Sequence, residues 1–223
     1  YERTPDDGHG FIGWKSFVDD PAGKPLKSNS GKIEIYCQQR YDLMASYGYP
    51  GVEQYKPYPT YVTPCVGYES TFKDGKIGGE KGDYPFIMYN PHYLRRSHTV
   101  FDNCPWLRET WANPVFVSRE DAKAKGISDG DTVLISTPAG KGLRRAAVLD
   151  ILLPGVVGVP HGAWVDVDEK TGIDRAGSDN YLIGAEYGGF GVSGYNNQIC
   201  NIEKYTGDAL EPDCEWPQRI VNA

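Results

Sequence analysis

The pattern of apolar and polar positions predicts a chain built mainly from short β-strands. Turn signals rich in glycine and proline separate the strand-like runs at close spacing, and little of the chain has the period of a helix. This pattern favours a β-barrel or a β-sandwich. The predicted strands are residues 33–37, 86–89, 132–135, 143–149, 155–159 and 198–205.

One short helix is strongly specified by local signals. Ser118 is a good N-cap, and Asp121 three residues later completes a capping-box pattern. Acidic residues follow in the first turn and lysines in the last, which complements the helix dipole. Gly126 supplies a left-handed residue that ends the helix. Asp129-Gly130 then predicts a tight turn into the strand at 132–135.

Composition divides the chain into three predicted parts. Residues 1–83 are rich in glycine, proline and tyrosine without a sustained period, so we expect an extended N-terminal arm and lead-in segment. Residues 84–206 hold most of the predicted strands and should form the folded barrel. Residues 207–223 carry two prolines and are expected to form a C-terminal arm.

Charge and length exclude several classes of protein. The chain has 30 acidic and 23 basic residues and a formal net charge of −7, which argues against a nucleic-acid binder. No apolar run approaches the ~20 residues that span a membrane, so no direct membrane insertion is expected. The five cysteines form no C-x-x-C pair, a poor pattern for zinc or an iron–sulfur cluster. The N-terminus has neither methionine nor a signal-peptide pattern, so we expect a fragment of a larger protein.

The segment 95–99, Arg-Arg-Ser-His-Thr, is the best candidate for binding a ligand. Two guanidiniums, two hydroxyls and an imidazole follow a predicted strand and suit phosphate oxygens. A solvated loop is the alternative interpretation. Because the chain is negative overall, an anion would need such a local cationic group.

Two later segments offer further polar groups. His161-Gly162-Ala163 follows a buried strand, where a glycine lets the backbone approach a ligand closely, although a structural turn has the same pattern. Asn180, Asn196, Asn197 and Gln198 carry amides able to read the edges of a purine or pterin, or they simply form turns. The chain has no G-x-S-x-G, H-E-x-x-H or P-loop motif.

The order of these motifs is more specific than any one of them. It reads His-Tyr-x-x-Arg-Ser-His-Thr, Trp-x-Asn-Pro, Asp-Ala-x-x-x-Gly-Ile-x-Asp-Gly-Asp-x-Val, Pro-Gly-Val-Val with Gly-Ala-Trp, Gly-x-x-Asn-x-Leu and Glu-Lys-Tyr. Residues 28–206 thereby resemble the C-terminal molybdopterin-dinucleotide-binding domain of the dimethyl sulfoxide reductase family of molybdenum or tungsten oxidoreductases. Within that family, the anaerobic dimethyl sulfoxide reductase catalytic chains look most similar.

The resemblance implies a fold, a ligand and a set of contacts. The fold would be a mainly β, six-stranded double-psi β-barrel with short helices and long irregular arms. The ligand would be bis(molybdopterin guanine dinucleotide) carrying molybdenum or tungsten, with Arg96 as the main charge and Arg95 less important. By position, the implied cofactor-binding residues are Asn90, His92, Arg96, Ser97, His98, Thr99, Asn113, His161, Gly162, Ala163, Asn180, Asn196, Asn197 and Gln198.

The resemblance also implies what surrounds the chain. The parent enzyme would carry out two-electron reduction or oxygen-atom transfer in anaerobic respiration, and the metal ligand and any iron–sulfur cluster would lie in its N-terminal part. The expected partners are the N-terminal domains of the same enzyme, an iron–sulfur electron-transfer subunit and a membrane anchor. The location would be periplasmic or on the outer face of a prokaryotic cytoplasmic membrane. This chain alone would hold no catalytic residue and no metal ligand, and would be inactive.

Two other classes remain open. A stand-alone double-psi barrel could act as a protein-interaction module, but it would not need the Arg-Ser-His-Thr loop or the late amides. A small barrel hydrolase or decarboxylase would need a nucleophile–base pair, and the sequence supports none.

Overall fold

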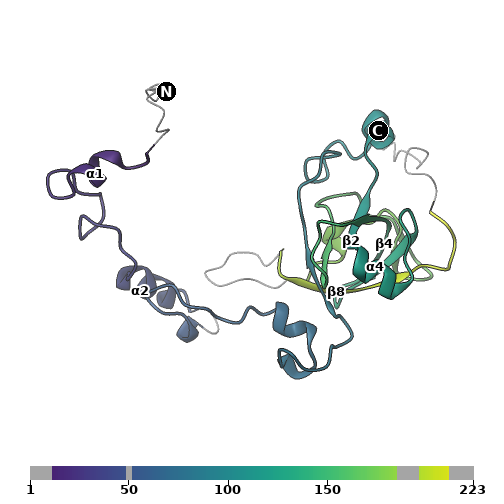
Figure 1. Ribbon diagram of the computed structural model, residues 1–223, viewed down its shortest axis with the longest axis horizontal. Helices are drawn as coiled ribbons and strands as arrows, with labels where there is room; N and C mark the ends of the chain where they lie inside the picture. The colour runs from purple at the N-terminus through teal and green to yellow at the C-terminus, as the bar shows by residue number, and fades with distance from the viewer. Residues whose placement is uncertain (1–11, 49–51, 185–195, 211–223) are drawn as a thin grey trace. The chain divides into compact units, whose positions relative to one another are not determined.

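A computed structural model describes residues 12–48, 52–184 and 196–210 of the chain (Figure 1). No described helix is long and apolar enough to cross a membrane. The described α-helices are α1 (Lys15–Asp19), α2 (Gln38–Ser46), α3 (Pro105–Thr110) and α4 (Arg119–Lys125). Short 3₁₀ helices are η1 (Val52–Gln54), η2 (Tyr68–Thr71), η3 (Lys73–Gly75) and η4 (Asp179–Tyr181). The strands are β1 (Phe86–Tyr89), β2 (Pro114–Ser118), β3 (Thr132–Ser136), β4 (Lys141–Leu149), β5 (Val156–Gly158), β6 (Val167–Asp168), β7 (Ile173–Asp174) and β8 (Gln198–Lys204).

The chain divides into two compact units between Val62 and Thr63. In the described part of the first unit, Met44 on α2 is the only buried hydrophobic residue. The strand predicted at 33–37 is wrong: the segment forms no strand, and Ile33 and Ile35 are 74% and 71% exposed. Alternating residues form a stable strand only where other strands pair with them, and this unit has none in its described residues.

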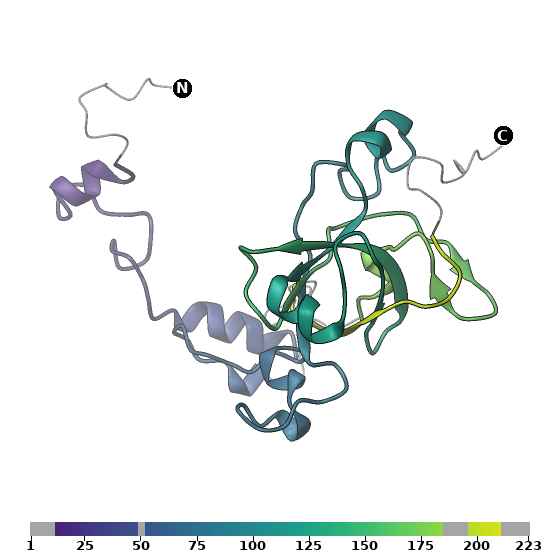
Figure 2. The same cartoon turned by 45° about the vertical axis from the view of Figure 1, so that its right-hand side comes forward.

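Six strands of the second unit close into a ring. β1 pairs in parallel with β5, which pairs antiparallel with β2, and β2 pairs in parallel with β4. β4 pairs antiparallel with β3, β3 with β8, and β8 with β1, which completes the circle (Figure 2). This closed, mixed, six-stranded ring is the double-psi β-barrel that the sequence resemblance implied. β6 and β7 extend the sheet beyond β4.

The barrel interior is filled by apolar side chains from all six strands. β2 was not predicted as a strand, because its Pro-Val-Phe-Val run does not alternate in polarity. Such a continuous apolar run is typical of a strand that is buried on both faces, and four of the five β2 residues are buried. The fully buried residues of this core include Met88, Val115, Val117, Val133, Ile135, Val157, Cys200 and Ile202, and β4 contributes Ala146, which is 5% exposed.

Helix α4 packs against β2, β4 and β8 and confirms the predicted start and end signals. The Ser118 hydroxyl accepts the N–H of Asp121 at 3.0 Å, and Gly126 ends the helix at φ +64°. The carboxylate of Asp121 accepts the Ser118 hydroxyl at 2.6 Å and the N–H of Gly155 at 2.8 Å. The cap therefore also ties the helix to the turn that precedes β5.

Replacing Gly126 by valine should destabilise the barrel by about 1–3 kcal/mol, because a β-branched residue is strained at positive φ. A Cβ at this position would meet no atom within 4 Å, so the effect isolates backbone strain. Gly126→Asn is the matched control, since asparagine tolerates the left-handed conformation. Urea unfolding of the three proteins tests this, and equal stability of the valine variant would contradict the strain argument.

Candidate functional site

The parallel pairing of β1 and β5 brings two of the predicted ligand loops together. Tyr89, the last residue of β1, pairs with Gly158, the last residue of β5. The segments that follow the two strands therefore leave the barrel at the same end. The N–H of Val159 then donates to the Tyr89 carbonyl at 2.9 Å, and the N–H of His161 donates to the Pro91 carbonyl at 2.9 Å. The segments 90–104 and 159–164 therefore leave this end of the barrel side by side.

Gly162 is where these two segments touch. A Cβ on Gly162 would lie 1.7 Å from the carbonyl oxygen of His98 and 2.8 Å from Cδ of Arg96. Three non-glycine residues nearby have positive φ, namely His98 at 54°, Phe101 at 71° and Ala163 at 92°. Such conformations cost about 1–2 kcal/mol each, and strain of this kind concentrates at functional sites.

Three of the chain's four histidines gather at this contact. Nδ1 of His161 lies 2.6 Å from Oδ2 of buried Asp179, and Nε2 of His161 lies 2.7 Å from Nδ1 of His98. An ionised carboxylate can only accept, so His161 carries its proton on Nδ1 and accepts the Nδ1–H of His98. His98 is then left with Nε2 as an acceptor. The His92 ring packs against both, with centroid distances of 5.6 Å.

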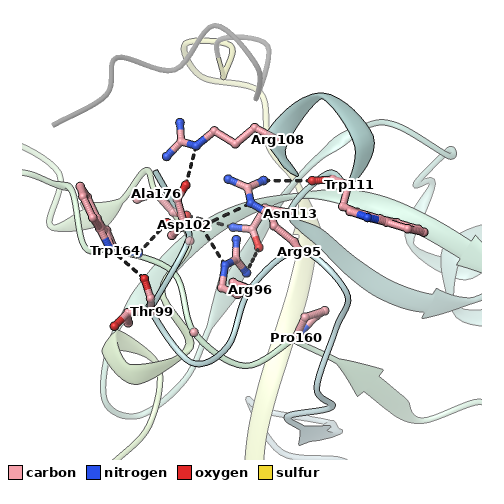
Figure 3. A network of polar contacts seen from close by, with 12 residues as sticks. Arg95, Arg96, Thr99, Asp102, Arg108, Trp111, Asn113, Pro160, Trp164 and Ala176 are labelled. Atoms are coloured by element: carbon pink, nitrogen blue, oxygen red, sulfur yellow. Dashed lines mark hydrogen bonds and ion pairs between the residues drawn. The ribbon is translucent and has the colours of Figure 1, made fainter. Parts of the chain in front are cut away.

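Buried Asp102 also joins the two segments, through Arg96 on one and Trp164 on the other (Figure 3). Its Oδ1 lies 2.7 Å from Nε of Arg96 and 3.3 Å from Nε of Arg95, and its Oδ2 accepts the N–H of Trp164 at 3.0 Å. Nε of Arg108 donates to the Asp102 carbonyl at 2.6 Å. Burial raises the pKa of Asp102, but Arg96, the Trp164 N–H and Arg95 outweigh it, so the pKa is lower than usual.

Arg96 is more enclosed than the sequence suggested. Its side chain is fully buried, with Nε on Asp102 and Nη1 donating to Oδ1 of Asn113 at 3.0 Å. The Asn113 amide in turn donates to the Ala176 carbonyl at 3.0 Å. Nη2 of Arg96 and Oδ1 of Asn90 are buried atoms without a hydrogen-bond partner within the described residues. The geometry therefore leaves the Nη2 atom of Arg96, which carries two N–H groups, to donate to a ligand.

The other predicted residues lie in different surroundings. Ser97 and Thr99 are exposed on the first segment, and the Thr99 carbonyl accepts the indole N–H of Trp164 at 3.1 Å. Exposed Asn196 accepts the backbone N–H of Asn90 at 3.3 Å through Oδ1. Asn180 and Asn197 are exposed, whereas Gln198 is buried on β8 opposite Met88 of β1.

Sequence reasoning missed the charged residues that hold the site together. Asp179 accepts the Gly162 N–H at 2.8 Å and the Asn90 amide at 3.3 Å, in addition to its contact with His161. Arg144, Asp102 and Arg108 were not candidates either, because an isolated charged residue usually lies on the surface. No sequence signal separates these four from exposed arginines and aspartates.

The buried charges leave a surplus of positive charge. In the described residues four arginines and three aspartates are buried, so the difference is one positive charge. The chain as a whole carries −7. The end of the barrel that carries the two segments therefore suits an anionic ligand, although the overall field of the protein does not. The buried charged residues are Arg95, Arg96, Arg108, Arg144, Asp102, Asp174 and Asp179.

Comparisons with known proteins point to one family. The sequence model described as "Molydopterin dinucleotide binding domain" matches residues 86–191. The dimethyl sulfoxide reductase DmsA of Escherichia coli K12 is 36% identical over 187 residues, which cover 82% of this chain and 21% of that protein. The trimethylamine-N-oxide reductase of Pasteurella multocida is 34% identical over 215 residues, which cover 91% of this chain and 24% of that protein. The chain thus spans between a fifth and a quarter of these relatives.

A solved structure shares the fold. Acetylene hydratase from Pelobacter acetylenicus superposes with a TM-score of 0.60 at 17% sequence identity, covering 87% of this chain and 28% of that one. At this identity the similarity concerns the fold alone.

Gly162→Ala should destabilise the protein by about 2–4 kcal/mol, since it adds a steric clash to positive-φ strain. Gly155→Ala is the matched control, because Gly155 has φ +81° and its Cβ would meet nothing within 4 Å. Chemical denaturation of both variants separates the clash from the strain. Equal losses of stability would show that the two segments can move apart freely.

Asp102→Asn should destabilise the protein at neutral pH by about 3–5 kcal/mol, the usual effect of breaking a buried ion pair. The folded pKa of Asp102 is lowered, so its stabilisation is present above the unfolded pKa of about 3.9 and is lost as pH falls through the folded pKa. The stability difference between wild type and variant should therefore shrink below about pH 4. Urea titrations over a series of pH values measure it, and a constant difference would contradict the assignment.

Proposed function

We propose that this chain binds molybdopterin guanine dinucleotide, from the premise that its residues 86–191 belong to the family of molybdopterin dinucleotide-binding domains. The observation that carries the proposal is the buried, net positive network at the end of the barrel where β1 and β5 finish. It contains Arg96, Asn113 and His161, three residues that the sequence resemblance had assigned to the cofactor.

The chemistry of the free groups fits such a ligand. A diphosphate needs N–H donors and positive charge, and Arg96 has one buried donor atom, Nη2, without a partner in the described residues. A pterin or guanine also needs acceptors, which Oδ1 of Asn90 and Nε2 of His98 can supply. Gly162, which lacks a Cβ, lets the backbone approach closely. These residues would hold the organic part of the cofactor.

The role of this chain would be binding and orientation. When bound in the parent enzyme, the cofactor supplies two-electron reduction or oxygen-atom transfer at molybdenum or tungsten. The contributions of this chain are a rigid loop cluster, hydrogen bonds to the dinucleotide and exclusion of water. We assign it no catalytic residue and expect no reductase activity from the 223-residue chain alone.

Exposed apolar residues support a partner within the same enzyme. Leu94, Val100, Phe101 and Trp106 are 69%, 56%, 54% and 65% exposed, and they lie within or next to the Arg95–Asp102 segment. Such a cluster is typical of an interaction surface, and we propose that it packs against other domains of the parent enzyme. From the sequence resemblance, we also propose two further partners, an iron–sulfur electron-transfer subunit and a membrane anchor. The proposed location is the periplasm or the outer face of the cytoplasmic membrane.

The proposed function is tested by calorimetric titration of the 223-residue chain with guanosine diphosphate. This compound is the part of the cofactor that contains the base and the diphosphate. Arg96→Lys should weaken binding about tenfold, because a lysine cannot reproduce the guanidinium contacts. Arg95→Lys is the matched control and should weaken it less.

If Arg95→Lys weakens the binding of guanosine diphosphate more than Arg96→Lys does, Arg95 is the main positive charge of the site. If the folded wild-type chain does not bind guanosine diphosphate, the proposal fails, and an interaction module becomes the better interpretation.

A further inference from the structure

Arg144 lies in the middle of β4, where it is paired with Val133 of β3 and only 1% exposed. Its guanidinium donates to four backbone carbonyls. Nε reaches Gly177 at 2.8 Å, Nη1 reaches Pro114 at 3.1 Å, and Nη2 reaches Pro160 at 2.8 Å and Gly162 at 3.5 Å. A single side chain thereby bonds to three separate segments of backbone.

Each of these segments carries a group that we assign to the ligand site. Pro114 follows Asn113, the partner of Arg96. The Pro160 and Gly162 carbonyls flank His161, and Gly177 lies two residues before Asp179, the partner of that histidine. Displacing the guanidinium would free all three segments at once.

The fit between Arg144 and its surroundings is tight. A Cβ on Gly177, which has φ +69°, would lie 2.9 Å from Cγ of Arg144 and 2.5 Å from the carbonyl oxygen of Leu143. The segment can approach β4 only because residue 177 has no side chain. The backbone at Gly177 therefore packs directly against the aliphatic part of the Arg144 side chain.

Carbonyl oxygens, rather than carboxylates, are the hydrogen-bond partners of this cation. The Asp174 carboxylate accepts backbone N–H groups from Asp166, Ala176 and Ser178. Asp179 bonds to His161 and Gly162, and Asp102 bonds to Arg96 and Trp164. Burial and the charge of Arg96 lower the pKa of Arg144 to about 9, which leaves it protonated at neutral pH. The charges of Asp179, Asp102 and Asp174 act against this lowering, so these aspartates partly balance the charge of Arg144 from a distance. Because arginines outnumber aspartates among the buried charges of the described residues, the network still carries net positive charge.

We propose that Arg144 is a positioning residue for the anionic ligand, holding three loops in register and supplying part of the positive charge that attracts a diphosphate. This inference rests on the proposed function and deepens it. A purely structural arginine would affect stability but would not change the affinity of the folded protein.

Three variants separate charge, geometry and stability. Arg144→Lys keeps the charge but cannot reach four carbonyls, whereas Arg144→Met keeps much of the volume and removes the charge. Arg145→Met is the matched control, because Arg145 is the next residue of β4 and donates to the Leu210 carbonyl at 2.9 Å, outside the site. Each folded variant is titrated with guanosine diphosphate at about 50 and about 200 mM salt, where electrostatic attraction differs through screening.

We expect Arg144→Lys to weaken binding about tenfold while keeping the salt dependence, because the charge remains. Arg144→Met should weaken it more and reduce the salt dependence, and Arg145→Met should leave affinity within about twofold of wild type, a change well under the value of one hydrogen bond. Wild-type affinity in both folded Arg144 variants would overturn the inference. Failure of the folded wild type to bind would instead overturn the proposed function, and this inference with it.

Wild-type protein provides a second measurement if the variants do not fold. The Nε–H of Arg144, held 2.8 Å from the Gly177 carbonyl, should give a slowly exchanging NMR signal. Guanosine diphosphate should shift that signal while the Arg145 signal stays in place. An Arg144 signal that does not move on saturation would overturn the inference.

Discussion

Charge buried away from water is the constraint on which the structure depends at the end of the barrel where β1 and β5 finish. A charge removed from water costs several kcal/mol unless hydrogen bonds or an opposite charge compensate it. The loops provide that compensation here. Asp102 is surrounded by arginines and Arg144 by carbonyls. Asp174 accepts backbone N–H groups, and Asp179 accepts one backbone N–H together with the side chains of Asn90 and His161. Because each buried charge needs several partners in fixed positions, the charges determine the path of the backbone around them.

That constraint explains backbone conformations that the local sequence does not favour. His98 and Ala163 have positive φ, and Gly162 approaches the His98 carbonyl more closely than any Cβ would allow. Strain persists where the surroundings over-determine it, and the bonds from Asp102 and Asp179 to both segments do so. A cluster held in this way need not be ordered by its ligand, which lowers the entropic cost of binding.

The first unit lacks both a buried charge network and an apolar core within its described residues. Its described residues bury one hydrophobic side chain, Met44, and leave Trp14, Ile33 and Ile35 more than two-thirds exposed. Its helices are only 5 and 9 residues long, and helices of this length gain most of their stability from packing. Packing within the described residues of this unit therefore supplies little of its stability.

The sequence by itself determined the local elements of the fold, whose signals lie within a few residues of one another. It predicted α4 with both of its caps, the Asp129-Gly130 turn and five of the six barrel strands, because each signal is local. It failed at residues 33–37, where alternation lacked a pairing strand, and at β2, whose burial on both faces removes the alternation.

Only the tertiary structure decided how the site is assembled. Closure of the barrel brings His98 to His161 across 63 residues of sequence, and Asn90 to Asp179 across 89. It also places Arg144, Asp102 and Asp179 away from water, although arginine and aspartate in a sequence normally indicate a surface. The physical reason is that a side chain's partners and its burial are set by strand pairing over long separations, which no local pattern of residues records.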